Sequence, residues 1–117
     1  MSRYDGQLQS HSFAEDEQVR VGTDRSEAWV SERLLDRLLT VGRAYGLHVL
    51  SILSDVPRHE QAWVNRQQAE ALLDEVGFLT AVLEKDAAFQ ALSETVVPLV
   101  AEAARYGGDD ALVFEGP

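Results

Sequence analysis

The stretch that decides the fold runs from residue 60 to residue 105 and reads EQAWVNRQQAEALLDEVGFLTAVLEKDAAFQALSETVVPLVAEAAR. It begins with a short β-like run, residues 60–64, and continues with two amphipathic helices. In the first helix, apolar side chains recur every three or four residues and so share one face. They are Ala69, Leu72, Leu73, Val76, Leu79 and Leu83. The connection at residues 84–86 is short, which predicts that the second helix returns antiparallel to the first.

Residues of known capping preference mark the ends of these two helices. Asn65 and Asp86 carry side-chain oxygens that accept hydrogen bonds from amides in the first helical turn. Gly107 follows the second helix as a stop signal, and Pro98 lies inside that helix. Because proline has no N–H and its ring crowds the preceding turn, we expect either a kink at residues 94–97 or two shorter helices.

The first of the two helices has a second apolar face. Phe78 and Val82, with Ala71 two turns earlier, lie almost opposite the main stripe. A helix that is apolar on two sides is either covered by a second layer of the protein or leaves one side for a partner. Core packing is the commoner of the two arrangements, and we expect it here.

The remaining chain is interpreted by the same rules. Residues 17–22 alternate as a strand and are expected to form a β-hairpin with the preceding residues. A helix is expected from Asp24 to Gly46, because Asp24 and Glu27 have the spacing of a capping box and Gly46 is a typical stop. Ser26 is a competing start. Residues 47–53 are apolar in both alternating sets, which predicts a strand covered on two sides and paired with residues 60–64. Residues 111–115 give a last short strand.

Together these elements predict one α+β domain that spans residues 1–117. Its small, mostly antiparallel sheet packs against three helices. Residues 1–16 form either a weakly ordered N-terminal arm or an edge strand. The main alternative is an all-α bundle, in which the segment from Leu47 to Leu53 continues as helix.

Composition narrows the classes of function. The 117 residues include no cysteine, which excludes thiol nucleophiles and zinc–thiolate sites, and the net charge is −10. This charge argues against binding to nucleic acid or to anionic membrane surfaces. Its first interpretation is that acidity keeps the protein soluble, and its second is that a negative surface steers a basic protein partner into place. We expect a cytoplasmic protein, since the start of the chain does not resemble a signal peptide. Nine arginines to one lysine fit a GC-rich bacterial genome.

The histidines carry no catalytic signature. His48 lies in an apolar segment, where a packed histidine is commoner than a catalytic one. His59 adjoins Glu60, but no second histidine follows at the spacing of the zinc helix motif. We therefore predict no metal site and no cofactor. The alternative is a small-molecule or metal-dependent enzyme that uses His48, His59 and nearby carboxylates.

Our first hypothesis is a non-enzymatic, acidic protein-interaction domain. Such a protein could be an inhibitor, an immunity-type antidote or an accessory subunit. The predicted partner-binding residues are Trp63 and Phe78 as apolar anchors, with Glu70, Asp74 and Glu75 as the acidic surround. For each aromatic taken singly, packing in the core is the commoner arrangement and remains the alternative. Trp29 is a further anchor of the same kind. A homodimeric structural protein, which would bury the second apolar stripe across a two-fold axis, is another alternative.

Overall fold

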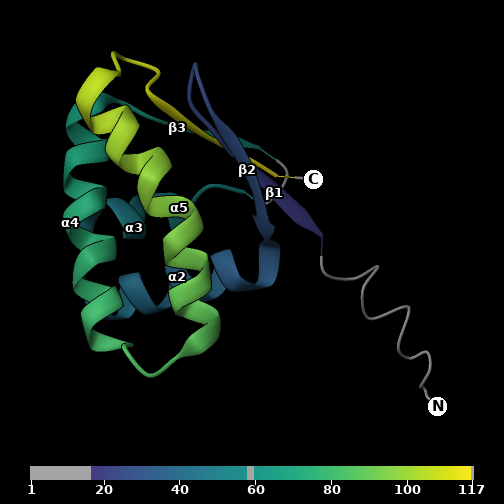
Figure 1. Cartoon of the computed structure of the whole chain (residues 1–117), viewed down its shortest axis with the longest axis vertical. Helices are drawn as coiled ribbons and strands as arrows, with labels where there is room; N and C mark the ends of the chain where they lie inside the picture. Colours follow the sequence, from purple (N-terminus) through teal and green to yellow (C-terminus); the bar gives the residue numbers. More distant parts are fainter. Residues whose placement is uncertain (1–16, 58–59, 117) are drawn as a thin grey trace.

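The computed structural model describes residues 17–57 and 60–116 of the chain. These residues contain four β-strands and four α-helices (Figure 1). The strands are β1 (Gln18–Gly22), β2 (Glu27–Ser31), β3 (Gln61–Val64) and β4 (Leu112–Glu115). The helices are α2 (Glu32–Ala44), α3 (His48–Ser54), α4 (Arg66–Val82) and α5 (Ala87–Tyr106). The predicted α+β class is confirmed, with one helix more than expected. The predicted N-terminal arm or edge strand, residues 1–16, lies outside the described residues.

The strands form one antiparallel sheet in the order β2-β1-β4-β3. The last strand of the chain, β4, therefore lies in the middle of the sheet, between β1 and β3. The predicted pairing of residues 60–64 with residues 47–53 is wrong, because β3 pairs with β4 instead. The helices pack on one face of this sheet, and α4 and α5 run antiparallel to each other as predicted (Figure 1).

The predicted start of the first helix at Asp24 is wrong, because residues 23–26 form the turn of the β1–β2 hairpin. The Thr23 hydroxyl accepts hydrogen bonds from the backbone N–H groups of Arg25 (3.1 Å) and Ser26 (3.0 Å). The chain then runs back along β1 as β2. Helix α2 begins eight residues later than Asp24, and the Ser31 hydroxyl caps it by accepting from Leu34 N at 3.3 Å.

The predicted end of this helix at Gly46 is confirmed. Gly46 has a φ of 73°, which side chains other than glycine rarely adopt. Its N–H donates to Arg43 O at 3.0 Å, and the N–H of Leu47 donates to Gly42 O at 2.9 Å. This pair of hydrogen bonds is the Schellman motif, which satisfies carbonyl groups left unpaired at the end of a helix.

Residues 47–53 form helix α3, so the predicted strand is wrong. The buried residues Val49, Leu50 and Leu53 have helical spacing, and they pack into the core. The N-cap residue Leu47 makes no side-chain hydrogen bond, and the first turn is instead held by the carboxylate of Glu75 from α4. This long-range contact is invisible in the local pattern. The all-α alternative predicted a helix at these residues, and in this one segment it is confirmed. The four-stranded sheet excludes an all-α bundle for the protein.

The predicted caps of α4 and α5 are confirmed. Asn65 and Gln68 form a reciprocal capping box on α4, and Asp86 Oδ1 accepts from Phe89 N at 3.0 Å on α5. Helix α5 is continuous through Pro98, so of the two expected outcomes, a kink or two shorter helices, the second is wrong. Within the residues described, no helix has both the length and the apolar character that crossing a membrane requires.

Candidate functional site

The outer face of the sheet is the most distinctive surface of the described structure. Along each strand, alternate side chains point to opposite faces. The inner set packs into the hydrophobic core with the helices and includes Val19, Val21, Val30, Ala62, Val64, Leu112 and Phe114. No helix or strand among the described residues covers the opposite set (Figure 1). We call the surface that this set forms the outer sheet face.

The strand register arranges the outer sheet face in rows that cross all four strands. One row joins Glu27, Gly22, Val113 and Trp63, and the next row joins Trp29, Arg20, Glu115 and Gln61. The two tryptophans therefore lie on the two edge strands, β2 and β3. Three strand spacings put them about 14 Å apart across the sheet.

Both tryptophans are accessible from solvent, whereas the apolar residue between them is not. Trp29 is 58% exposed and Trp63 is 51% exposed. Val113, which pairs with Trp63, is only 5% exposed although it lies outside the main core cluster. The outer sheet face thus has a buried apolar residue at its centre and a large aromatic side chain on each side.

A cluster of charged residues connects the same four strands. The Arg20 guanidinium on β1 donates from Nε to Glu27 Oε1 on β2 (2.6 Å) and from Nη1 to Glu115 Oε1 on β4 (3.2 Å). Gln61 on β3 donates to the other oxygen of Glu115. The hydrogen bond and the charge of Glu27, joined by those of Glu115, raise the pKa of Arg20 above its ordinary value. Two carboxylates against one guanidinium leave this cluster with a net negative charge.

The two predicted apolar anchors lie on different surfaces. Trp63 belongs to the outer sheet face, whereas Phe78 lies three turns into α4, roughly 18 Å along the helix from its start. Phe78 is 46% exposed, and its ring packs edge-to-face against Tyr45 with the ring centroids 5.6 Å apart. Val82 is also exposed, at 40%. The expected covering of this second apolar face by core packing is therefore wrong.

The three predicted acids of α4 divide into two kinds. Glu70 and Asp74 are exposed, one turn apart, and available to solvent. Glu75 is half-buried, and its two carboxylate oxygens accept hydrogen bonds from Val49 N and Leu50 N, both at 2.9 Å. The carboxylate of Glu75 thus faces α3 and stabilises the fold.

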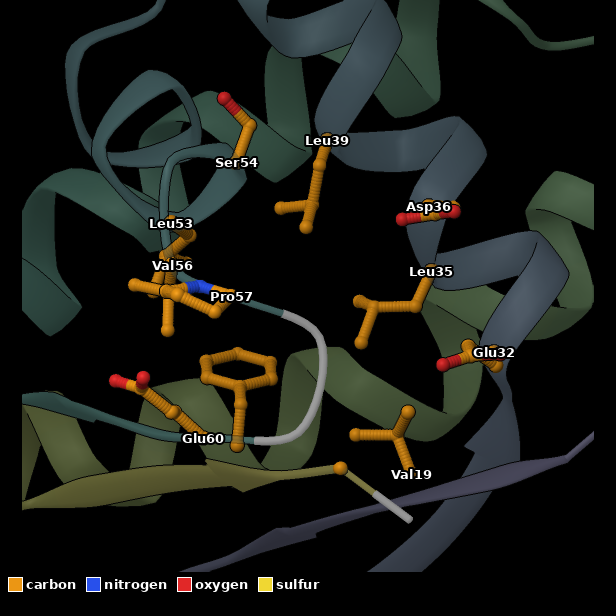
Figure 2. A pocket seen from close by; sticks show the side chains of 12 residues that line it. Val19, Glu32, Leu35, Asp36, Leu39, Leu53, Ser54, Val56, Pro57 and Glu60 are labelled. Atoms are coloured by element: carbon orange, nitrogen blue, oxygen red, sulfur yellow. The ribbon is translucent and has the colours of Figure 1, made fainter.

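A pocket of about 260 Å³ lies between α2, the segment after α3, and the sheet (Figure 2). Apolar side chains line much of it, among them Val19, Leu35, Leu39, Val56 and Phe114. Figure 2 shows Glu32 and Asp36 on α2 at one side and Glu60 across from them. Within the described part of the chain, no three histidines or acids are placed to hold a metal ion.

Of the two histidines in the enzyme alternative, His48 is the one within the described residues, and it lies away from this pocket. His48 is exposed at the first residue of α3 and is not among the residues that line the pocket. His59 and His11 lie outside the described residues.

Sequence reasoning missed the combination of Arg20, Glu27 and Glu115. Arg20 and Glu115 are 95 positions apart, so only the sheet register brings them together. Glu27 and Trp29 were assigned to a helix, which hid their place on the sheet. No protein-family model, curated protein or solved structure matches the chain.

Proposed function

We propose that the protein is a non-enzymatic interaction domain that binds a protein partner through the outer sheet face. The observation that carries this proposal is the exposure of Trp29 and Trp63, at 58% and 51%, on a face that no described element covers. Tryptophan is the residue type most enriched where alanine substitution weakens protein–protein binding. Two such side chains on one open face support the proposal that partners bind there.

The residues around the tryptophans also suit an interface. Interfaces are enriched in aromatic residues and arginine, and they have a polar rim. On the outer sheet face, Arg20 lies between the two tryptophans and is held in place by Glu27 and Glu115. An arginine that is already fixed by ion pairs loses little side-chain entropy when a partner docks onto it.

Charge indicates the kind of partner. The chain has 20 acidic and 10 basic residues and a net charge of −10, so its field attracts positively charged proteins and raises their rate of association. We propose a basic partner. Inhibitors, immunity-type antidotes and accessory subunits all act by docking onto a preformed protein, and the proposal covers these three classes.

The test is affinity capture with matched variants. Tagged wild-type protein, Trp29→Ala, Trp63→Ala and Phe78→Ala are each used to capture partners from lysate of the cells that express the protein. Phe78 is the control, because it is similarly exposed but lies on α4. We expect the basic partner to be retained by wild type and Phe78→Ala and to be lost or strongly reduced with either tryptophan variant.

The opposite pattern would contradict the proposal. A partner that is lost with Phe78→Ala and kept with both tryptophan variants would move the interface to α4. Circular dichroism of each variant separates loss of binding from loss of fold, and all three substitutions are at exposed side chains that the fold is expected to tolerate.

A further inference from the structure

Among the described residues, the edge of strand β2 at Glu27 and Trp29 has no strand neighbour, because β2 pairs only with β1. Two hydrogen bonds define which backbone groups point to that edge: Thr23 N donates to Ser26 O, and Glu32 N donates to Glu17 O, both at 2.8 Å. Bonded pairs alternate along an antiparallel ladder. They lie at residues 23 and 26 at one end of the hairpin and at residues 17 and 32 at the other.

This alternation determines which residues of β1 and β2 are hydrogen-bonded to each other between the two ends of the hairpin. Ala28 and Val30 bond to β1, and the backbone N–H and C=O groups of Glu27 and Trp29 point away from β1. No described residue is paired with them across that edge. The edge therefore offers donors and acceptors at alternate residues, which is the pattern that an additional strand requires.

A groove runs beside this edge, between β2 and α5. Its volume is about 440 Å³, and it is lined by Ala28 from β2 and by residues of α5 that include Pro98, Leu99 and Tyr106. A strand added to β2 would direct alternate side chains into this groove. The other side chains would lie on the outer sheet face, next to Trp29.

We infer that an extended segment of the partner binds along the free edge of β2 as a fifth strand of the sheet. Main-chain hydrogen bonds to Glu27 and Trp29 would supply affinity, and the groove along α5 would select apolar side chains at alternate positions. The inference rests on the proposed function. It specifies that the partner binds through an extended segment that pairs with β2.

The charges on the outer sheet face beside β2 indicate that the segment is basic. There the carboxylates of Glu27 and Glu115 share the single guanidinium of Arg20, which leaves this cluster net negative. In a chain of net charge −10, the cluster favours lysine or arginine at the positions of the segment that lie on the outer sheet face.

The test uses peptides selected without knowledge of the partner. A phage library of random decapeptides is panned against the full-length protein, and the selected peptides are synthesised. Amide hydrogen exchange is then measured by NMR with and without peptide. We expect selected peptides to alternate apolar and basic residues and to slow the exchange of the Glu27 and Trp29 amides.

A pair of variants at one position isolates the backbone contribution. Glu27→Pro and Glu27→Gln both remove the carboxylate that pairs with Arg20, but only proline also removes the N–H at the free edge. Since this N–H does not bond to β1, the proline variant keeps the ladder of the hairpin. We expect peptide to bind the proline variant about tenfold more weakly than the glutamine variant. Equal affinities would overturn the inference.

A second pair keeps the inference testable if Glu27→Pro fails to fold. Thr95 is exposed and lines the groove, so Thr95→Trp fills it from α5. Ala88 is exposed on the same helix and does not line the groove, so Ala88→Trp is the matched control. We expect loss of peptide binding with the first substitution and wild-type binding with the second. Wild-type binding by both variants would overturn the inference.

The outcomes separate this inference from the proposed function. Peptides that protect the amides of Gln61 and Trp63 on the β3 edge, or a library that gives no binder, would overturn binding at β2. So would dimerisation of the protein that Glu27→Pro abolishes, since the occupant of the edge would then be a second copy. In each case the proposed function stands if Trp29→Ala and Trp63→Ala still lose the captured partner, and it fails if both keep it.

Discussion

The carboxylate of Glu75 joins two helices that are distant in sequence. Its two oxygens accept the backbone N–H groups of Val49 and Leu50 at the start of α3, each at 2.9 Å. The N-cap residue Leu47 offers no side-chain acceptor, so Glu75 satisfies donors that the first turn would otherwise leave unpaired. A negative charge at the amino end of a helix is also favoured by the helix dipole.

This role gives a prediction at the residue scale. Glu75→Ala removes both acceptors and is expected to lower the free energy of unfolding by about 1–3 kcal/mol. The matched control is Asp74→Ala at the neighbouring exposed residue, for which we expect a change within about 0.5 kcal/mol. Urea denaturation followed by circular dichroism measures both. Equal effects of the two substitutions would show that Glu75 does not hold α3.

Predictions from the sequence were most accurate for individual residues at the ends of helices. Asn65, Asp86 and Gly46 were predicted correctly as helix ends, because capping depends on hydrogen bonds within a few residues of the chain. Glu75 was predicted to face a partner. Nothing in the pattern of α4 could show that α3 packs beside it and takes up its carboxylate.

At the scale of elements, the packing of α2 against α3 depends on a glycine. Gly42 is buried, and a Cβ at this position would come within 2.5 Å of Leu50 Cδ1 and 2.6 Å of Leu50 Cβ. The two helices can therefore approach closely only without a side chain at residue 42. Gly77 in α4 contrasts with it, because a Cβ there meets nothing within 4 Å.

The two glycines are expected to respond to the same substitution in opposite ways. Gly42→Ala forces α3 away from α2 and should destabilise the protein by about 1–3 kcal/mol. Gly77→Ala improves helix propensity without a clash and should stabilise it by about 0.5–1 kcal/mol. Thermal unfolding measures both changes. A Gly42→Ala variant as stable as wild type would contradict the described contact between α2 and Leu50.

Two elements were predicted with the wrong type for the same physical reason. Residues 47–53 are apolar in both alternating sets, and Asp24 and Glu27 have the spacing of a capping box, so the local pattern was misleading in both stretches. Contacts from elsewhere decide between helix and strand. The Thr23 hydroxyl closes the turn that starts β2, and Glu75 holds the first turn of α3. By contrast, α4 and α5 are long enough for their periodicity to be unambiguous.

At the scale of the whole molecule, the order of the strands creates the outer sheet face. The C-terminal strand β4 lies between β1 and β3, which brings Glu115 to Arg20 and separates Trp29 and Trp63 to the two edges. The α+β class followed from the succession of elements along the chain. The outer sheet face did not, because it depends on pairings between residues as far as 95 positions apart.

Fluorine NMR tests the role of this surface most directly. The chain contains only two tryptophans, Trp29 and Trp63, so labelling with 5-fluorotryptophan places one reporter on each edge strand of the outer sheet face. Spectra are recorded for the free protein and for its complex with unlabelled partner. We predict that both resonances shift or broaden in the complex. A complex that forms while both resonances stay unchanged would show that the partner binds elsewhere.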